Sequence, residues 1–194
     1  MKTRIAAALL ATVMAGTASA AMVTYEIDPS HTYPSFEADH MGVSIWRGKL
    51  DHTMGKVILD KAAGKGDVDV NIDLASIDFG HDKMNTWARS DKFFDTAKYA
   101  HATYKGKLAG FAKGVPTKVV GELSLHGVTR AVELKINSFK CIPHPMLKRD
   151  LCGADALATF NREDFGLTAG KDYGFNMGVT LRIQIEAVAS EKQP

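Results

Sequence analysis

Apolar and polar residues alternate along most of the chain with a period of two. The alternation is clearest at 68–74, 132–137 and 179–186, where every second side chain is apolar. Such a segment suits a strand with one face in the core and one in water. Weaker alternation marks 24–27, 35–40, 56–59, 102–108, 118–125 and 154–160. The pattern predicts an all-β protein of eight or nine antiparallel strands.

Turn residues separate these segments, and nothing marks a boundary between domains. Glycine and proline gather at 64–66, 110, 114–116, 127 and 170–172, where they favour turns. Residues 21–194 contain neither an internal repeat nor a Pro/Gly/Ser-rich linker. We therefore expect a single domain, long enough to bury a core of its own.

The inward positions of the predicted strands carry small side chains. An antiparallel domain of this size is either a sandwich or a closed barrel. The residues expected to face inward include Val68, Val70, Ala102, Ala154, Ala156, Ala158 and Val179. Because small side chains leave room, they favour an eight-stranded barrel with an apolar cavity. A tightly packed sandwich remains the alternative.

Residues 81–98 break the alternation. Met84 and Trp87 are three residues apart, as on one face of a helix, and Ser90 or Asp91 suits the cap of a second turn. We expect one or two short helices near residues 82–95, joining two strands.

The same segment is rich in bulky apolar and basic residues. A short helix over an open barrel end would place Met84, Trp87, Phe93 and Phe94 at the entrance to a cavity, where ligand pockets form. The basic side chains on this segment, Lys83, Arg89 and Lys92, would then be available to hold a polar head group.

The first twenty residues have the pattern of a secretory signal peptide. Lys2 and Arg4 precede an apolar run at 5–15, and small residues at 18–20 suit cleavage near Ala20. Because Lys2 and Arg4 account for the formal net charge of +2, the rest of the chain is neutral, which argues against nucleic acid as a partner. No later apolar run reaches the ~18 residues of a membrane-spanning helix. We expect a soluble, exported protein.

Cys141 and Cys152 are the only cysteines. Export favours a structural disulfide between them. The alternative is a redox-active pair, but the spacing is not the Cys-x-x-Cys typical of such pairs. Pro143 and Pro145 lie between them and argue against a helix or a central strand, so we expect an irregular loop. A bridge closing about twelve residues stabilises a protein by roughly 2–3 kcal/mol.

Signatures of catalysis are scarce. The histidines show no metal-ligand spacing, and the Gly-x-Ser-x-Gly and phosphate-loop motifs are absent. Asp-Phe-Gly at 164–166 lacks the other kinase elements, and we interpret 162–164 as a polar turn after a strand. His31 and His40, on either side of Phe36, are the best candidates for the alternative function, a histidine-based metalloprotein or enzyme of the cell envelope.

Four motifs stand in order along the chain: Asp28-Pro29-Ser30-His31 with Phe36, His40-Met41-Gly42 and Gly48; 90–95 with Lys98-Tyr99; 121–130; and 161–166. Together, over about 24–188, they resemble the YceI-like family of periplasmic, lipocalin-like polyisoprenoid-binding proteins. The resemblance implies an eight-stranded antiparallel lipocalin-like barrel that holds a long isoprenoid without catalysis. It also supports the disulfide, since a subset of the family carries a similar cysteine loop. One departure, at 81–88, replaces the usual Arg-Asp pair and Leu, so the head-group contacts are expected to differ.

The expected ligand is a quinone, a prenyl phosphate or a similar amphiphilic lipid, with no other cofactor and no metal. The residues predicted to contact it are Phe36, His40, Trp46, Val70, Met84, Trp87, Phe93, Phe94, Phe160, Arg162, Phe175 and Met177. The protein is also expected to form a homodimer and to have a partner in an envelope redox complex. A second alternative function is that of a partner subunit of such a complex. The expected location is the periplasm.

Overall fold

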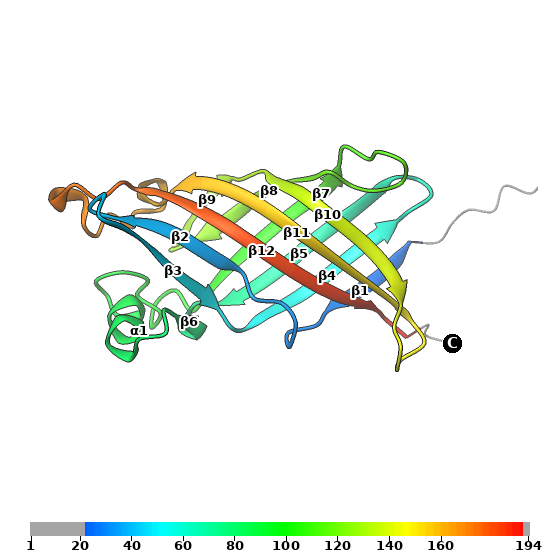
Figure 1. Cartoon of the computed structure of the whole chain (residues 1–194), viewed down its shortest axis with the longest axis horizontal. Coiled ribbons are helices and arrows are strands. Elements are labelled where there is room, and N and C mark those ends of the chain that lie inside the picture. The colour runs from blue at the N-terminus through cyan, green and yellow to red at the C-terminus, as the bar shows by residue number, and fades with distance from the viewer. Residues whose placement is uncertain (1–21, 192–194) are drawn as a thin grey trace, which may run out of the picture.

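Strand β12 (Gly178–Ala189) organises the sheet, because it pairs with three other strands. In the computed structural model, which describes residues 22–191, one edge of β12 pairs along its length with β11 (Asp150–Asn161). The other edge pairs first with β2 (Ser35–His40) and then with β1 (Val23–Ile27). β1 and β2 therefore follow each other along one edge of β12, joined by the loop at 28–34, in the elongated body seen in Figure 1.

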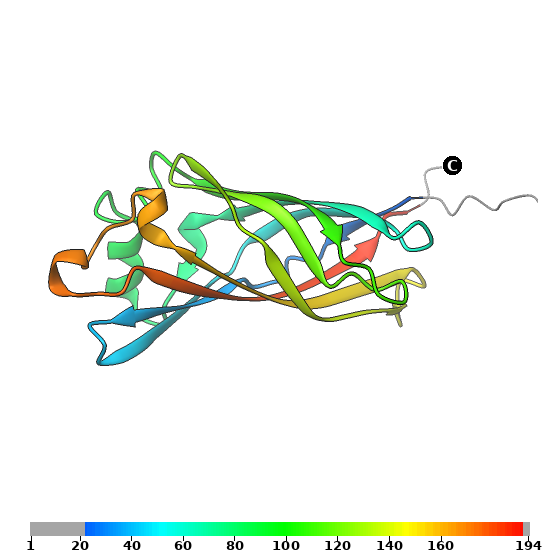
Figure 2. The ribbon, with the colours of Figure 1, turned by 90° about the horizontal axis from the view of Figure 1, so that it is seen from above.

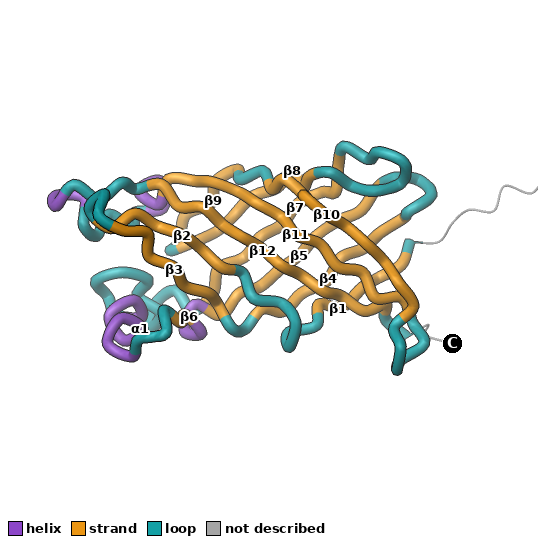
Figure 3. Tube along the Cα trace, in the orientation of Figure 1, coloured by secondary structure: helices purple, strands orange, loops and turns teal. Residues whose placement is uncertain are grey.

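Within residues 22–191, eight antiparallel strands close into a ring. In order around the barrel they are β1, β4 (Thr53–Asp60), β5 (Lys65–Asp73), β7 (His101–Ala109), β8 (Lys118–Leu125), β10 (Leu134–Pro143), β11 and β12. The ring closes because β1 pairs with β4 on one side and with β12 on the other. The eight-stranded antiparallel barrel predicted from the sequence is thus confirmed, and the sandwich is excluded. Figures 2 and 3 show the strands crossing along its length.

Shorter strands extend the barrel wall at one end. β2 pairs with β3 (Ser44–Leu50), β3 pairs with β6 (Ile77–Asp78), and β9 (Val128–Ala131) pairs with β8. The alternation did not indicate β3, because its turn and outer face expose Val43 and Ile45 while Gly48 lies half-buried on its inner face. One apolar residue on the outer face and a glycine on the inner face weaken the period-two signal of so short a strand.

One α-helix, α1 (Asp82–Arg89), occurs within residues 22–191, and it lies beside β6 (Figure 1). The His81 side chain caps its first turn by accepting a hydrogen bond from the Met84 N–H. Residues 91–94 form a turn, so only one of the predicted one or two short helices is present. The remaining helical elements are short 3₁₀ turns, η1 (Leu74–Ser76), η2 (Arg162–Phe165) and η3 (Lys171–Tyr173).

The segment between the cysteines is a hairpin of two strands, which corrects the expected irregular loop. β10 continues to Pro143 and β11 begins at Asp150, with Cys141 directly opposite Cys152. The two cysteines form the predicted disulfide, with their Cα atoms 4.0 Å apart. Proline is tolerated because β10 pairs with β8 only near its start, so its outer part is an edge that needs no N–H donor on its free side.

The predicted signal peptide, residues 1–20, lies outside the described residues. Within 22–191, no helix is both long enough and apolar enough to cross a membrane. The site described next is formed by the barrel and by the loops at one of its ends.

Candidate functional site

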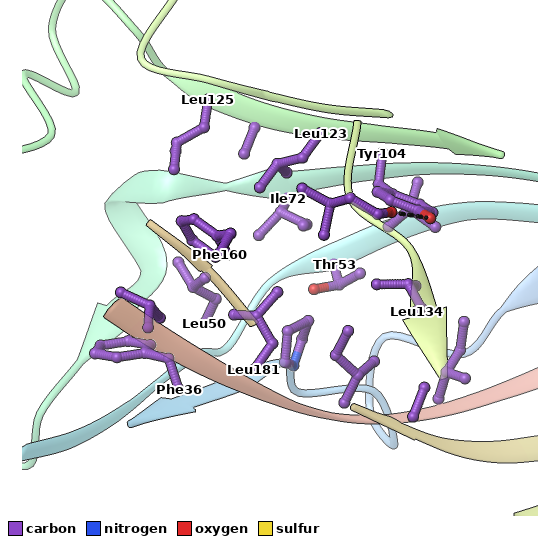
Figure 4. A pocket seen from close by; sticks show the side chains of 18 of the residues that line it. Phe36, Leu50, Thr53, Ile72, Tyr104, Leu123, Leu125, Leu134, Phe160 and Leu181 are labelled. Carbon is purple, nitrogen blue, oxygen red and sulfur yellow. Dashed lines mark hydrogen bonds between the residues drawn. The ribbon is translucent and has the colours of Figure 1, made fainter. Parts of the chain in front are cut away.

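An apolar cavity of about 260 Å³ lies inside the barrel (Figure 4). Every strand of the ring contributes side chains to it; those of β12 are Val179, Leu181, Ile183, Ile185 and Ala187. At about 3.4 Å per residue, these positions span about 27 Å along the strand. The volume is close to the lower end of the range for ligand sites, about 300–1,000 Å³. Because so small a volume is spread over such a length, the cavity is a narrow tunnel.

Small side chains leave the space that forms this tunnel. Of the residues predicted to face inward, Val68, Val70, Ala102, Ala154, Ala156 and Val179 line the cavity. The other, Ala158, is buried without lining it. The period-two pattern therefore identified much of the tunnel wall, because strand side chains alternate between the two faces of a sheet.

Most of the residues predicted to bind a ligand lie in the tunnel wall: Phe36, Trp46, Val70, Trp87, Phe93, Phe94, Phe160, Arg162 and Phe175. The other three lie outside it. His40 stacks on Trp46 with ring centroids 4.1 Å apart, Met84 is half-buried on α1, and Met177 is buried. Contact with a ligand stays a prediction for all twelve.

Aromatic rings gather where the tunnel approaches α1, which we call the α1 end. Trp87 and Phe93 stack there with centroids 5.1 Å apart, and Phe93 also contacts Phe94 at 4.6 Å. Phe36 and Phe79 also line the tunnel and meet edge to face at 5.4 Å. The middle of the tunnel and its far end are lined mainly by aliphatic side chains. The two ends therefore offer different surroundings to a ligand.

Gly48 gives the Phe36 ring its position. The two residues are directly opposite each other on β3 and β2. A Cβ atom at position 48 would lie 2.5 Å from Cζ of Phe36, far inside van der Waals contact. Only glycine lets this ring lie across β3, which is a physical reason for the Phe and Gly of the first motif to occur together.

Arg162 is a charged residue within this largely apolar wall. It is 7% exposed, and its Nη1 and Nη2 donate hydrogen bonds of 2.6 Å to the carbonyl oxygens of Leu167 and Ala169. Burial lowers the pKa of the guanidinium below its ordinary value, although arginine stays protonated in proteins. The expected turn at 162–164 is present as part of η2, directly after β11, and Asp164 is exposed there, but Arg162 is buried rather than in water.

The basic residues on and after α1 do not line the tunnel. Lys83 and Lys92 are exposed to solvent, and Nη1 of Arg89 donates to the carbonyl oxygen of Ala75 at 3.1 Å. Arg162 is the basic residue among the described residues that line the tunnel, and its Cζ lies 5.8 Å from the centroid of Phe93. The positive charge available to a head group thus comes from the loop after β11.

Thr53 lines the tunnel and was not singled out from the sequence. It is 1% exposed, and its Oγ1 has no hydrogen-bond partner among the described residues. Figure 4 shows this hydroxyl within the pocket. The alternation of Leu59 and Val57 continues back through Gly55 to Thr53, but a glycine and a hydroxyl in the apolar positions hid the start of the strand.

His31 and His40 have separate surroundings. His31 forms a 2.7 Å hydrogen bond to Oδ2 of Asp28, which raises the pKa of His31, while hydrogen bonds from Ser30 and His31 lower the pKa of Asp28. The His40 ring stacks on Trp46 and meets Phe175 edge to face at 4.9 Å. In the part of the chain that the structure describes, no three His, Cys, Asp or Glu side chains are grouped so that they would hold a metal ion.

Known proteins resemble this chain over nearly all of its described length. The sequence profile of the YceI-like domain family matches residues 25–189. A UPF0312 protein of Vibrio cholerae is 31% identical over 191 residues, which cover 97% of this chain and 99% of the relative. A UPF0312 protein of Vibrio parahaemolyticus is 31% identical over 138 residues, 70% of this chain and 73% of the relative.

Two solved structures share the fold. BcnA of Burkholderia cenocepacia superposes with a TM-score of 0.66 at 21% identity, over 83% of this chain and 99% of BcnA. A polyisoprenoid-binding domain of Saccharophagus degradans, implicated in plant cell wall breakdown, gives a TM-score of 0.63 at 21% identity, over 87% of this chain and 99% of that domain.

Proposed function

We propose that this chain, which belongs to the YceI-like domain family, is a non-catalytic protein that holds a long isoprenoid or a similar amphiphilic lipid in its barrel. The observation that carries the proposal is the tunnel, which is narrow, almost wholly apolar and lined from every strand of the ring. The likeness of the fold to a domain that binds polyisoprenoids supports the choice of ligand.

The physical chemistry of the tunnel suits an extended apolar chain. Moving such a chain from water into an apolar site gains about 25 cal/mol for each Å² of surface removed from water. Because the tunnel is long and narrow, a linear chain fills it and a compact ring system does not. The aromatic α1 end would receive the polar head, where Trp87, Phe93 and Arg162 line the wall.

Mass spectrometry of an organic extract tests the proposal directly. The protein is purified without detergent, extracted with organic solvent and compared with an equal amount of an unrelated exported protein carried through the same steps. We expect a long-chain isoprenoid or related lipid in near-stoichiometric amount. Its absence from repeated preparations, together with failure of the lipid-free protein to bind geranylgeraniol, would contradict the proposal.

We also propose that the protein works in the periplasm after removal of residues 1–20. The n-region, apolar run and small residues of this segment support export, and a disulfide suits an oxidising compartment. Mass measurement of protein from the periplasmic fraction should give a chain that begins at Ala21. A full-length chain in the cytoplasmic fraction would contradict export.

The remaining sequence-based expectations stay predictions. A homodimer would double the mass measured by light scattering, and an envelope redox partner would co-purify with the protein from membranes. The alternative of a histidine-based metalloprotein requires stoichiometric zinc that is lost in His40→Ala.

A further inference from the structure

Arg162 lies in the wall of the tunnel without a counter-charge. The arginine–carboxylate pairs found within residues 22–191 involve Arg47, Arg149 and Arg182, whereas no carboxylate lies within 4.0 Å of the Arg162 nitrogens. Those three side chains are 67%, 30% and 57% exposed, so water already solvates their charges. Arg162, at 7% exposed, has exchanged water for two carbonyl oxygens. A buried charge is costly unless a partner of opposite charge or several hydrogen bonds compensate it.

The two carbonyl oxygens use only part of the hydrogen-bonding capacity of this side chain. A guanidinium has five N–H donors, and the bonds to Leu167 and Ala169 use one on each terminal nitrogen. The Arg162 main chain is itself held in place, because its N–H donates to the carbonyl oxygen of Met177 at 2.9 Å. The guanidinium is therefore held in place in the cavity wall, and its remaining N–H groups are available to a hydrogen-bond acceptor on a ligand.

The acidic side chain in the same wall does not neutralise Arg162. Asp39 is the one carboxylate among the described residues that line the tunnel. Its Oδ1 and Oδ2 accept hydrogen bonds from the Gly42 N–H at 2.9 and 3.0 Å, and Oδ2 also accepts from the Asn176 N–H at 3.1 Å. These bonds hold the carboxylate to the loops beside the tunnel, so Arg162 remains without an ion-pair partner.

We propose that the lipid in the tunnel carries an anionic head group, a phosphate or a carboxylate, that pairs with the Arg162 guanidinium. This rests on the proposed function, and it adds the chemical class of the head and the direction of the ligand. Carboxylates and phosphates both accept two parallel hydrogen bonds from a guanidinium. The head would lie beside Arg162 at the α1 end, and the tail would extend along β12 towards Ala187.

The test compares ligands that share a chain and differ in the head. Geranylgeranyl monophosphate and geranylgeraniol, and separately palmitic acid and 1-hexadecanol, compete with a neutral fluorescent probe for the lipid-free protein. We expect at least one acid to bind at least tenfold more tightly than its matched alcohol, and the pair that shows the preference identifies phosphate or carboxylate. Equal affinity within both pairs would overturn the inference and leave the proposed function standing. Failure of all four to bind would contradict the proposed function itself.

Variants separate the role of Arg162 from general electrostatics. Arg162→Gln should lose the preference for the acid and keep the affinity for the alcohol. The matched control Arg182→Gln, on the outside of the barrel, should keep both. A preference that survives in Arg162→Gln would overturn the inference. If Arg162→Gln does not fold, Arg162→Lys is measured instead. Because an ammonium lacks the two-pronged geometry of a guanidinium, the preference for the acid over the alcohol should fall at least threefold. An unchanged preference would overturn the inference.

Discussion

Asn85 of α1 is joined to Asp78 of β6 by a 2.9 Å hydrogen bond from its Nδ2 to Oδ1 of the carboxylate. The other side of the same amide, Oδ1, accepts from the Phe79 N–H at 2.8 Å. Asn85 is 9% exposed, so both bonds are largely shielded from water. One side chain therefore fastens the helix to the end of the barrel, where the aromatic residues of the helix and its following turn meet the tunnel.

Replacement of this amide should loosen the attachment of α1. We expect Asn85→Leu to lower the free energy of unfolding by about 1–3 kcal/mol, because a shielded backbone N–H loses its acceptor. Thr86→Ala on the exposed side of α1 is the control and should change stability little. Urea denaturation measures both variants, and equal effects would contradict the role assigned to Asn85.

A methyl group at position 48 should displace the Phe36 ring. Gly48→Ala is expected to cost about 1–3 kcal/mol, as overpacking does in a closely packed interior. Replacement of the ring by Phe36→Leu should remove most of the clash, so the double variant should be more stable than the sum of the two single changes indicates. A double-mutant cycle in urea measures the coupling. Strict additivity would show that the two residues are not in steric contact.

Reduction of the Cys141–Cys152 disulfide should destabilise the protein by roughly 2–3 kcal/mol, because the open hairpin adds freedom to the unfolded chain. Thermal denaturation with and without dithiothreitol measures the change. The double variant Cys141→Ala/Cys152→Ala should melt near the temperature of the reduced protein and should not respond to reductant. A melting temperature of the native protein that reductant leaves unchanged would contradict a structural role for the bridge.

The Asp28–His31 pair should make stability depend on pH in two directions. The lowered pKa of Asp28 stabilises the fold above the ordinary carboxyl range near pH 4, and this contribution is lost as the pH falls through the lowered value. The raised pKa of His31 stabilises the fold below about pH 6.5, and this contribution is lost as the pH rises through the raised value. The pair therefore contributes most between about pH 4 and pH 6.5.

NMR titration of the His31 ring checks this assignment. In the native protein the pKa of His31 should lie above its ordinary value, and Asp28→Asn should return it towards that value because the charged hydrogen-bond partner is gone. A His31 pKa that is the same in both proteins would show that the pair does not form in solution.

The sequence was most informative where one strand face is buried and the other is wet. The alternation at 68–74 and 179–186 located β5 and β12 and, with them, the small side chains of the tunnel. It failed at β3, where Ile45 is exposed on the outer face and a glycine lies on the inner one.

Other features depend on contacts that a linear pattern does not contain. The strands around Cys141 and Cys152 extend past the expected limit, because an edge position tolerates a proline that a central strand would not. Burial of Arg162 depends on carbonyl oxygens five and seven residues further along, and arginine is ordinarily exposed. The sequence placed this residue in the site but described its surroundings as a polar turn.

If the barrel interior holds the apolar chain of the ligand, a bulky side chain placed inside the barrel should block binding. Ala156 lines the tunnel on β11 and is 5% exposed, whereas Thr159 on the same strand faces solvent. Geranylgeraniol binding is measured for the lipid-free native protein, Ala156→Phe and the control Thr159→Phe. We expect one bound molecule for the native protein and the control, and at least a tenfold loss of affinity in a folded Ala156→Phe protein. Unchanged affinity and stoichiometry in Ala156→Phe would contradict binding inside the barrel.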